Sequence, residues 1–79
     1  MIPSLLSARY AGAYRIRLSY ADGTEAEVDL ESELWGGVFE SLKDVEQFKA
    51  FRLDEELQTV VWPNGADLAP EFLYQRATG

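Results

Sequence analysis

Hydrophobic and polar residues alternate along two stretches in the first half of the chain. The even positions from 14 to 20 are apolar or aromatic, and the odd positions from 25 to 33 are all acidic. A period of two residues is typical of a strand with one buried face. We therefore predict two antiparallel strands, joined by the turn Ala21-Asp22-Gly23.

The length of this turn decides which residues face each other. A two-residue Asp-Gly turn would place Leu18 on the same face as Glu27, because a shift of one residue moves every side chain to the other face. A three-residue turn with Gly23 in the left-handed conformation avoids this and pairs Tyr20 with Thr24. The expected pairs are Ile16 with Val28 and Leu18 with Ala26 on the core side, and Arg17 with Glu27 and Arg15 with Asp29 on the outer side.

The N-terminal residues predict a third strand of the same sheet. Apolar residues at positions 6, 8 and 10 alternate with polar ones, and Ala11-Gly12-Ala13 supplies another short turn. A three-residue turn there pairs Tyr10 with Tyr14 and places Arg9 opposite Arg15. Two like charges at such a position repel each other unless the acidic strand compensates. The expected sheet is a three-stranded antiparallel meander.

The second half predicts shorter elements. Asp44 is expected to cap a helix of at most two turns, with Gln47 completing a capping box. Residues 51–54 and 59–62 are expected to pair as a β-hairpin. A turn at Pro63-Asn64-Gly65 follows, and Pro70 suits the first turn of a C-terminal helix.

Residues 31–43 connect the two halves and break the alternation. They contain a Gly36-Gly37 bend and a dense apolar group, so we expect the segment to fold back onto the sheet; the group is Trp35, Val38, Phe39 and Leu42. With 79 residues and no linker or repeat, the chain is predicted to be a single domain, residues 1–79. Its class is α+β: an N-terminal three-stranded antiparallel meander, a short helix, a second β-hairpin and a short C-terminal helix.

Two residue types that often serve in catalysis and metal binding are absent. The chain has no histidine and no cysteine, so it lacks the commonest general base and any thiolate ligand. Most carboxylates fall on the expected exposed strand face, where they remain ionised, and acids spaced along a strand do not form a calcium loop. We therefore predict a protein that is not an enzyme, with no catalytic residue, no cofactor and no metal site.

The formal net charge is −7, and the residues from Asp22 to Glu40 include many acids and no base. Such a field repels nucleic-acid phosphates and anionic membranes and attracts basic partners. The acidic strand is either a solvated surface that keeps a small protein soluble or a docking face on which Glu27 and Asp29 contact a basic protein. Residues 1–12 match neither a signal peptide nor a membrane span, so a cytoplasmic location is expected.

Four further residues are candidates for partner binding. Trp35 and Trp62 are either interface hot spots or members of an aromatic-rich core. Asn64 lies in the turn after Pro63, at a position that tolerates positive φ. Asp67 follows closely, and its carboxylate either braces that turn through backbone amides or supplies a reactive group beside Trp62.

Three segments, DGTEAEVDL, GGVFESLKD and FRLDEELQTVVWPNGADLAPEFLY, resemble in this order the small bacterial family DUF2442. The resemblance extends from the first strand to about Gln75 and is most specific at VWPNGADL. It implies a compact α+β fold without an assigned enzymatic activity. Members often stand beside a gene for another small protein, in an arrangement similar to a toxin–antitoxin pair with this family as the antitoxin.

The resemblance also exposes two differences. Some relatives have a C-terminal helix-turn-helix domain, which residues 1–79 lack, and this weakens the transfer of a transcriptional role. Many relatives have glycine where Gln58 stands. A left-handed Gln58 would cost about 1 kcal/mol, unless the turn differs in this chain.

These observations favour a non-enzymatic protein-interaction module, an antitoxin-like partner of a small basic protein encoded by an adjacent gene. The alternative is an accessory domain of a transcription or nucleic-acid-associated system, without direct contact to nucleic acid. A free strand edge could also pair with a second copy of the chain or with a partner strand.

Overall fold

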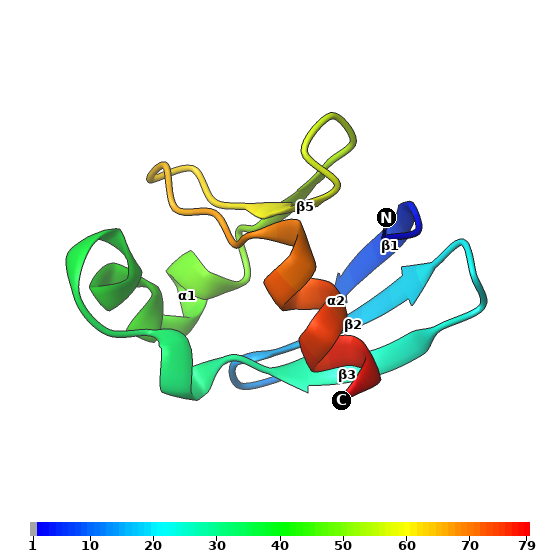
Figure 1. Ribbon diagram of the computed structural model, residues 1–79. Helices are drawn as coiled ribbons and strands as arrows, with labels where there is room; N and C mark the ends of the chain where they lie inside the picture. Colours follow the sequence, from blue (N-terminus) through cyan, green and yellow to red (C-terminus); the bar gives the residue numbers. More distant parts are fainter. Residues whose placement is uncertain (1) are drawn as a thin grey trace.

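The computed structural model describes residues 2–79, and Figure 1 shows the arrangement of its elements. Two separate sheets form, one with the strand order β1-β2-β3 and one from β4 and β5. The predicted α+β class and order of elements are confirmed. The elements are β1 (Leu5–Tyr10), β2 (Arg15–Tyr20), β3 (Glu25–Asp29), the 3₁₀ segments η1 (Glu31–Glu33) and η2 (Gly37–Lys43), α1 (Val45–Phe48), β4 (Arg52–Asp54), β5 (Thr59–Val61) and α2 (Pro70–Thr78).

The register of β2 and β3 agrees with the prediction. Ile16 faces Val28 and Leu18 faces Ala26 across the two strands. The three-residue turn closes with Tyr20 N–H donating to Thr24 O at 2.8 Å, and Gly23 adopts a φ of 90°. Alternation and turn chemistry therefore determine this hairpin together.

The predicted register of β1 and β2 is wrong by two residues. Tyr10 faces Ile16 rather than Tyr14, and Arg9 faces Arg17 rather than Arg15. The reason is that the ladder continues to Ala11, whose N–H donates to the carbonyl of Arg15 at 2.9 Å, so the turn falls one residue later, at residues 12–14. A shift of two residues keeps every side chain on its face, so the pattern alone does not reveal it.

A bulge near the start of β1 overturns a second expectation. Leu5 faces Tyr20 but Ser7 faces Ser19, so Leu6 is an extra residue in the strand. A bulge of this kind re-aims the neighbouring side chains. Leu5 is buried in the core, whereas Leu6, predicted to face the core, is 62% exposed.

The core lies on one face of the three-stranded sheet. Figure 1 shows α1, the β4–β5 hairpin and α2 on this face, with α2 crossing from β5 to β3. Phe48 of α1 is fully buried at its centre and contacts four other rings, those of Tyr10, Tyr14, Phe51 and Trp62. The other buried apolar residues are Leu5, Ile16, Leu18, Tyr20, Val28, Leu30, Leu34, Leu42, Val60, Trp62, Ala66, Leu68 and Leu73.

The cap of α1 is confirmed only in part. The Asp44 carboxylate accepts a hydrogen bond from Glu46 N–H at 3.0 Å, as expected of an N-cap. The reciprocal bond from Gln47 is not formed, because Asp44 N–H donates to Ser41 O of the preceding 3₁₀ turn instead. A helix of four residues is too short to persist alone, so the packing of Phe48 stabilises it.

The β4–β5 hairpin contains the left-handed residue that the family pattern indicates. Gln58 has a φ of 59° and ends the reversal before β5. Its side-chain Oε1 accepts a hydrogen bond from Leu5 N–H at 2.7 Å and so joins the hairpin to β1. A glycine could adopt this conformation without strain but could not form this bond.

Candidate functional site

The outer face of the three-stranded sheet pairs its charges internally. Arg15 forms an ion pair with Glu27 at 3.2 Å, and Arg17 forms one with Glu25 at 3.3 Å. The backbone register places Arg17 opposite Glu27 as predicted, but each arginine reaches diagonally to the acid two residues earlier than its cross-strand neighbour. Glu27, a predicted partner-binding residue, is therefore already paired with an arginine of its own sheet.

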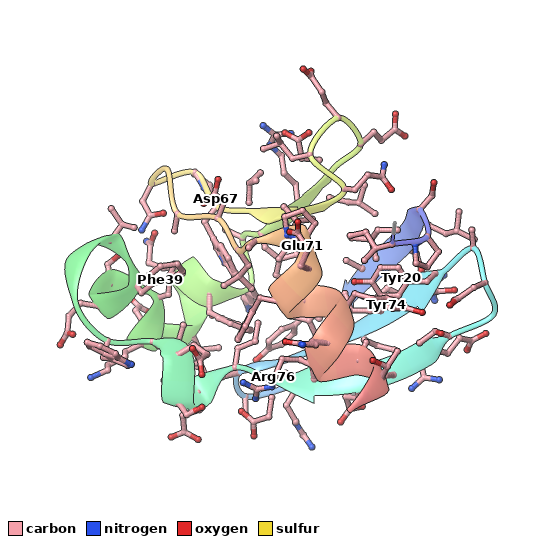
Figure 2. All side chains as sticks on the ribbon, in the orientation of Figure 1. Tyr20, Phe39, Asp67, Glu71, Tyr74 and Arg76 are labelled. Carbon is pink, nitrogen blue, oxygen red and sulfur yellow. The ribbon has the colours of Figure 1, made fainter. Side chains whose placement is uncertain are left out.

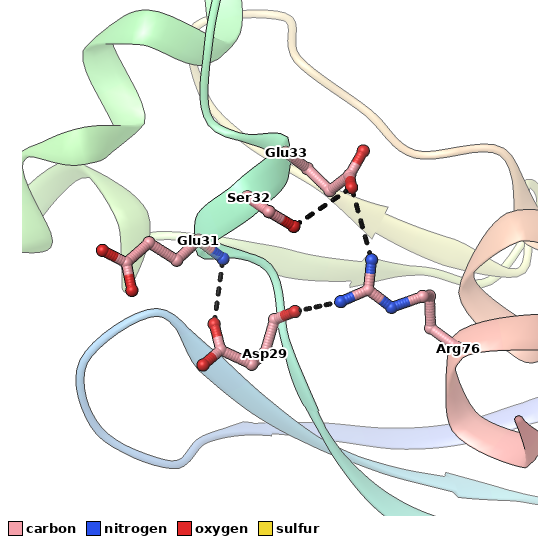
Figure 3. Close-up of polar contacts among 5 residues, drawn as sticks. All are labelled: Asp29, Glu31, Ser32, Glu33 and Arg76. Atoms are coloured by element: carbon pink, nitrogen blue, oxygen red, sulfur yellow. Dashed lines mark hydrogen bonds and ion pairs between the residues drawn. The ribbon is translucent and has the colours of Figure 1, made fainter.

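Asp29 serves the fold in two ways, shown in Figure 3. Its carboxylate accepts a hydrogen bond from Glu31 N–H at 2.9 Å and so starts η1. Its backbone carbonyl accepts a hydrogen bond from the guanidinium of Arg76, which also pairs with Glu33 at 3.3 Å. This cluster fastens the C-terminal helix to the end of β3. The Asp29 carboxylate, although exposed, thus contributes a contact to its own fold.

Trp62 belongs to the core. Only 3% of its surface is exposed, and its indole N–H donates to the carbonyl of Phe48 at 2.7 Å. The ring packs against Phe48 and Phe51, with centroids 5.9 and 6.3 Å away. Of the two roles open for Trp62, the structure places it in core packing, and a partner could not reach its ring in this conformation.

Asn64, not Asp67, braces the turn after β5. The Asn64 amide oxygen accepts from Ala66 N–H at 2.9 Å, whereas the Asp67 carboxylate has no hydrogen bond to any residue from 2 to 79. The expectation that Asp67 braces the turn is therefore wrong, because the amide oxygen of Asn64 already accepts the hydrogen bond from Ala66 N–H. Asp67 is exposed, and its backbone forms an isolated bridge with Val61.

The amide nitrogen of Asn64 reaches a segment 26 residues away in sequence. It donates to Val38 O and to Ser41 Oγ, each at 2.9 Å. Asn64 therefore holds η2 against the turn that follows β5. No local pattern in the sequence indicates this contact.

Trp35 is the most exposed large apolar side chain of the described chain, at 70%, and Val38 beside it is 47% exposed. Of the four apolar residues expected to fold onto the sheet, Leu42 is buried and Phe39 packs against the core, whereas the expectation is wrong for Trp35 and Val38. The Gly36-Gly37 bend, with φ values of 71° and 52°, follows Trp35 directly. We call the exposed residues here, Trp35, Val38, Glu40 and Asn64, the Trp35 surface.

The backbone of the Trp35 surface is fixed by polar contacts. The Glu40 carboxylate accepts from Gly36 N–H at 3.1 Å, and this bond, with the charge of Lys43, lowers the pKa of Glu40. Asn64 holds the carbonyl of Val38 from the other side. A fixed backbone reduces the conformational entropy that a binding event must remove.

Two tyrosines and an aspartate form a cluster that the sequence did not indicate. The rings of Tyr20 and Tyr74 meet edge to face, with their centroids 4.9 Å apart. Figure 2 labels both side chains. The Tyr74 hydroxyl donates to the Asp22 carboxylate, and this bond lowers the pKa of Asp22 and raises that of Tyr74. Burial, followed by the neighbouring Tyr74 and Asp22, raises the pKa of Tyr20 to about 12. A hydroxyl with this pKa stays protonated near neutral pH and is unsuited to act as a general base.

Among residues 2–79, no three histidine, cysteine, aspartate or glutamate side chains gather as a metal site would require. Within the same residues, no helix combines the length and the apolar character that crossing a bilayer requires.

Together, these features define a small α+β domain whose conspicuous polar side chains stabilise its own fold and which exposes one tryptophan on a fixed surface. The chain belongs to the family described as "Protein of unknown function (DUF2442)", whose model matches residues 5–79. The resemblance drawn from VWPNGADL is thereby confirmed. Comparisons with curated proteins and with solved structures each found no match.

Proposed function

We propose that this protein is a non-enzymatic protein-interaction module and that the Trp35 surface contacts its partner. The observation that supports this most directly is the 70% exposure of Trp35. A side chain of this size removes on the order of 150–250 Å² from water when it is buried. Tryptophan is also enriched among the residues that dominate binding energy.

The charge distribution favours a basic partner. On the outer sheet face, the acids of β3 are balanced by the arginines of β1 and β2, so the net charge of −7 rests on the other segments. The exposed Glu31 and Glu40 belong to the segment that includes Trp35, and Asp67 is exposed close to Asn64. Partners with a positive surface would be attracted to this end of the molecule.

Members of the family often stand beside a gene for another small protein, and this arrangement suggests the partner. We propose a small basic protein encoded by an adjacent gene, bound in the cytoplasm in an antitoxin-like manner. The test is co-expression with that gene product, followed by co-purification and a growth assay. The wild-type chain should capture the partner and relieve any growth defect that the partner causes.

Substitution of Trp35 locates the contact. Trp35→Ala should weaken partner binding at least about 30-fold, the loss typical of a tryptophan hot spot. Leu57→Ala is the matched control, because Leu57 is 47% exposed but lies in the β4–β5 turn. Absence of a complex with the wild type would refute the proposed function, and equal binding by the two variants would remove Trp35 from the interface.

An accessory role in transcription is the second candidate, by analogy with relatives that have a helix-turn-helix domain. The net charge of −7 opposes direct contact with phosphates, so any such role would act through the protein partner. A gel shift at low salt by the isolated chain would contradict this arrangement.

A further inference from the structure

Arg9 has an unfavourable position in the isolated chain. It lies on the edge strand β1 and faces Arg17 across the sheet. The other two arginines of this face form ion pairs with Glu27 and Glu25, but Arg9 has none among residues 2–79. Like charges directly opposite each other in a sheet are destabilising. An acid supplied by another chain would relieve this repulsion.

A groove of about 690 Å³ runs along the outer edge of the same strand. One wall is β1, from Leu5 to Arg9, and the other is formed by Leu53, Glu55 and Gln58 of the β4–β5 hairpin. In an antiparallel ladder every second residue of an edge strand directs its backbone N–H and C=O away from its neighbour. Gln58 accepts one such N–H, that of Leu5, and no ladder joins β1 to β4.

The ends of the groove have opposite charges. Gln58 places the hairpin turn at the Leu5 end, because its side chain bonds to Leu5 N–H and to the carbonyl of Glu55. Glu55 therefore lies near the start of β1, and Arg9 lies towards its other end. A two-fold axis across β1 makes the strands of two copies antiparallel, so that the Arg9 end of each groove lies against the Glu55 end of the other. Such an interface is self-complementary, as two-fold symmetry requires.

An exposed apolar side chain in the groove also favours pairing with a second copy. Leu6, which lines the groove, is 62% exposed because the bulge turns it outward. By contrast, pairing two copies through β3 would set Glu25, Glu27 and Asp29 against the same acids of the other copy. A basic strand would in turn be repelled by Arg9. The edge of β1 therefore favours a second copy of this chain.

We propose that the chain self-associates as a two-fold symmetric dimer through the β1 groove, with reciprocal Arg9–Glu55 pairs. This interface is separate from the Trp35 surface, so the proposal does not depend on the proposed function. At physiological ionic strength the Debye length is about 8 Å, so the repulsion between acids of the two chains that lie farther apart than this is largely screened.

Sedimentation velocity of the full chain, over a range of concentrations, tests the proposal. The wild type should form dimers, and Arg9→Glu or Glu55→Arg should each weaken dimerisation at least about 100-fold, because each places two like-charged pairs in the interface. An equimolar mixture of the two variants should dimerise again, since the glutamate introduced in one variant would face the arginine introduced in the other. Circular dichroism of each variant verifies that it is folded.

Matched control variants separate the groove from general charge effects. Lys43→Glu and Glu31→Arg make the same changes of charge on exposed residues outside the groove, and both should leave dimerisation unchanged. A monomeric wild type would overturn the proposal. So would a dimer that persists in Arg9→Glu, or a mixture of the two groove variants that stays monomeric.

Discussion

Replacing Gln58 separates the cost of its left-handed backbone from the stabilisation by its side-chain hydrogen bond. Gln58 has a left-handed backbone with a φ of 59°, and its side chain accepts a hydrogen bond from the N–H of buried Leu5. Gln58→Ala keeps the strained backbone and removes this bond, together with the bond that the side-chain nitrogen donates to the carbonyl of Glu55. Gln58→Gly removes the strain and both bonds.

The expected order of stability follows from these two terms. Loss of the acceptor for the Leu5 N–H should lower the free energy of unfolding by about 1–2 kcal/mol in Gln58→Ala. Glycine regains about 1–2 kcal/mol of strain but loses about 0.4–1 kcal/mol through the greater entropy of its unfolded chain. Gln58→Gly should therefore lie about 0.5–1 kcal/mol above Gln58→Ala, and close to or slightly below the wild type.

Urea denaturation followed by circular dichroism measures these free energies, and thermal melts check them. For a domain of this size, 1 kcal/mol corresponds to a change in Tm of about 4–8 °C. Equal stability of the glycine and alanine variants would refute the assignment of backbone strain to Gln58. A glycine variant clearly more stable than the wild type would show that the bond to Leu5 contributes nothing.

Four other substitutions test the polar contacts of the fold. Tyr20→Phe should raise the free energy of unfolding by about 1 kcal/mol in urea melts, because the Tyr20 hydroxyl is buried without a hydrogen-bond partner among residues 2–79. A loss of stability would contradict this and show that the hydroxyl forms a hydrogen bond. Asn64→Ala should lower the free energy of unfolding by about 1–3 kcal/mol, because the bonds to Val38 and Ser41 are lost. Asp67→Ala should change it by no more than about 0.5 kcal/mol. The reverse order would contradict the assignment of the brace to Asn64. Because the folded-state pKa of Asp22 lies below its usual value, its bond to Tyr74 stabilises the protein above that usual pKa and the contribution is lost as pH falls through the folded value. The stability gap between the wild type and Tyr74→Phe should therefore close in acid, and a gap independent of pH would exclude this linkage.

The sequence indicates the β2–β3 hairpin correctly because two independent signals agree there. Alternation assigns the faces, and Gly23 permits the only turn length that keeps both apolar sets on one face. For β1 the alternation does not distinguish the predicted register from the observed one, since a shift of two residues keeps every side chain on its face. The bulge that exposes Leu6 is likewise invisible, because Leu5 and Leu6 are chemically alike.

The candidate site was harder to predict than the fold. Composition cannot distinguish the buried Trp62 from the exposed Trp35, because the difference arises from which neighbouring elements cover each ring. The contact from Asn64 to Val38 joins residues 26 positions apart, beyond the reach of any turn pattern. The local use of the Asp29 carboxylate, which caps the turn at Glu31, becomes visible only with the 3₁₀ geometry.

The VWPNGADL motif has a consequence for the whole family. Its tryptophan fixes α1 through the carbonyl of Phe48, and its asparagine fixes η2 through Val38 and Ser41. The motif that identifies a member thus connects elements of the fold, and similarity in this motif indicates a shared fold. Under the proposed function, differences in partner choice between members should then be sought in the short stretch from Trp35 to Glu40, which lies beside these contacts.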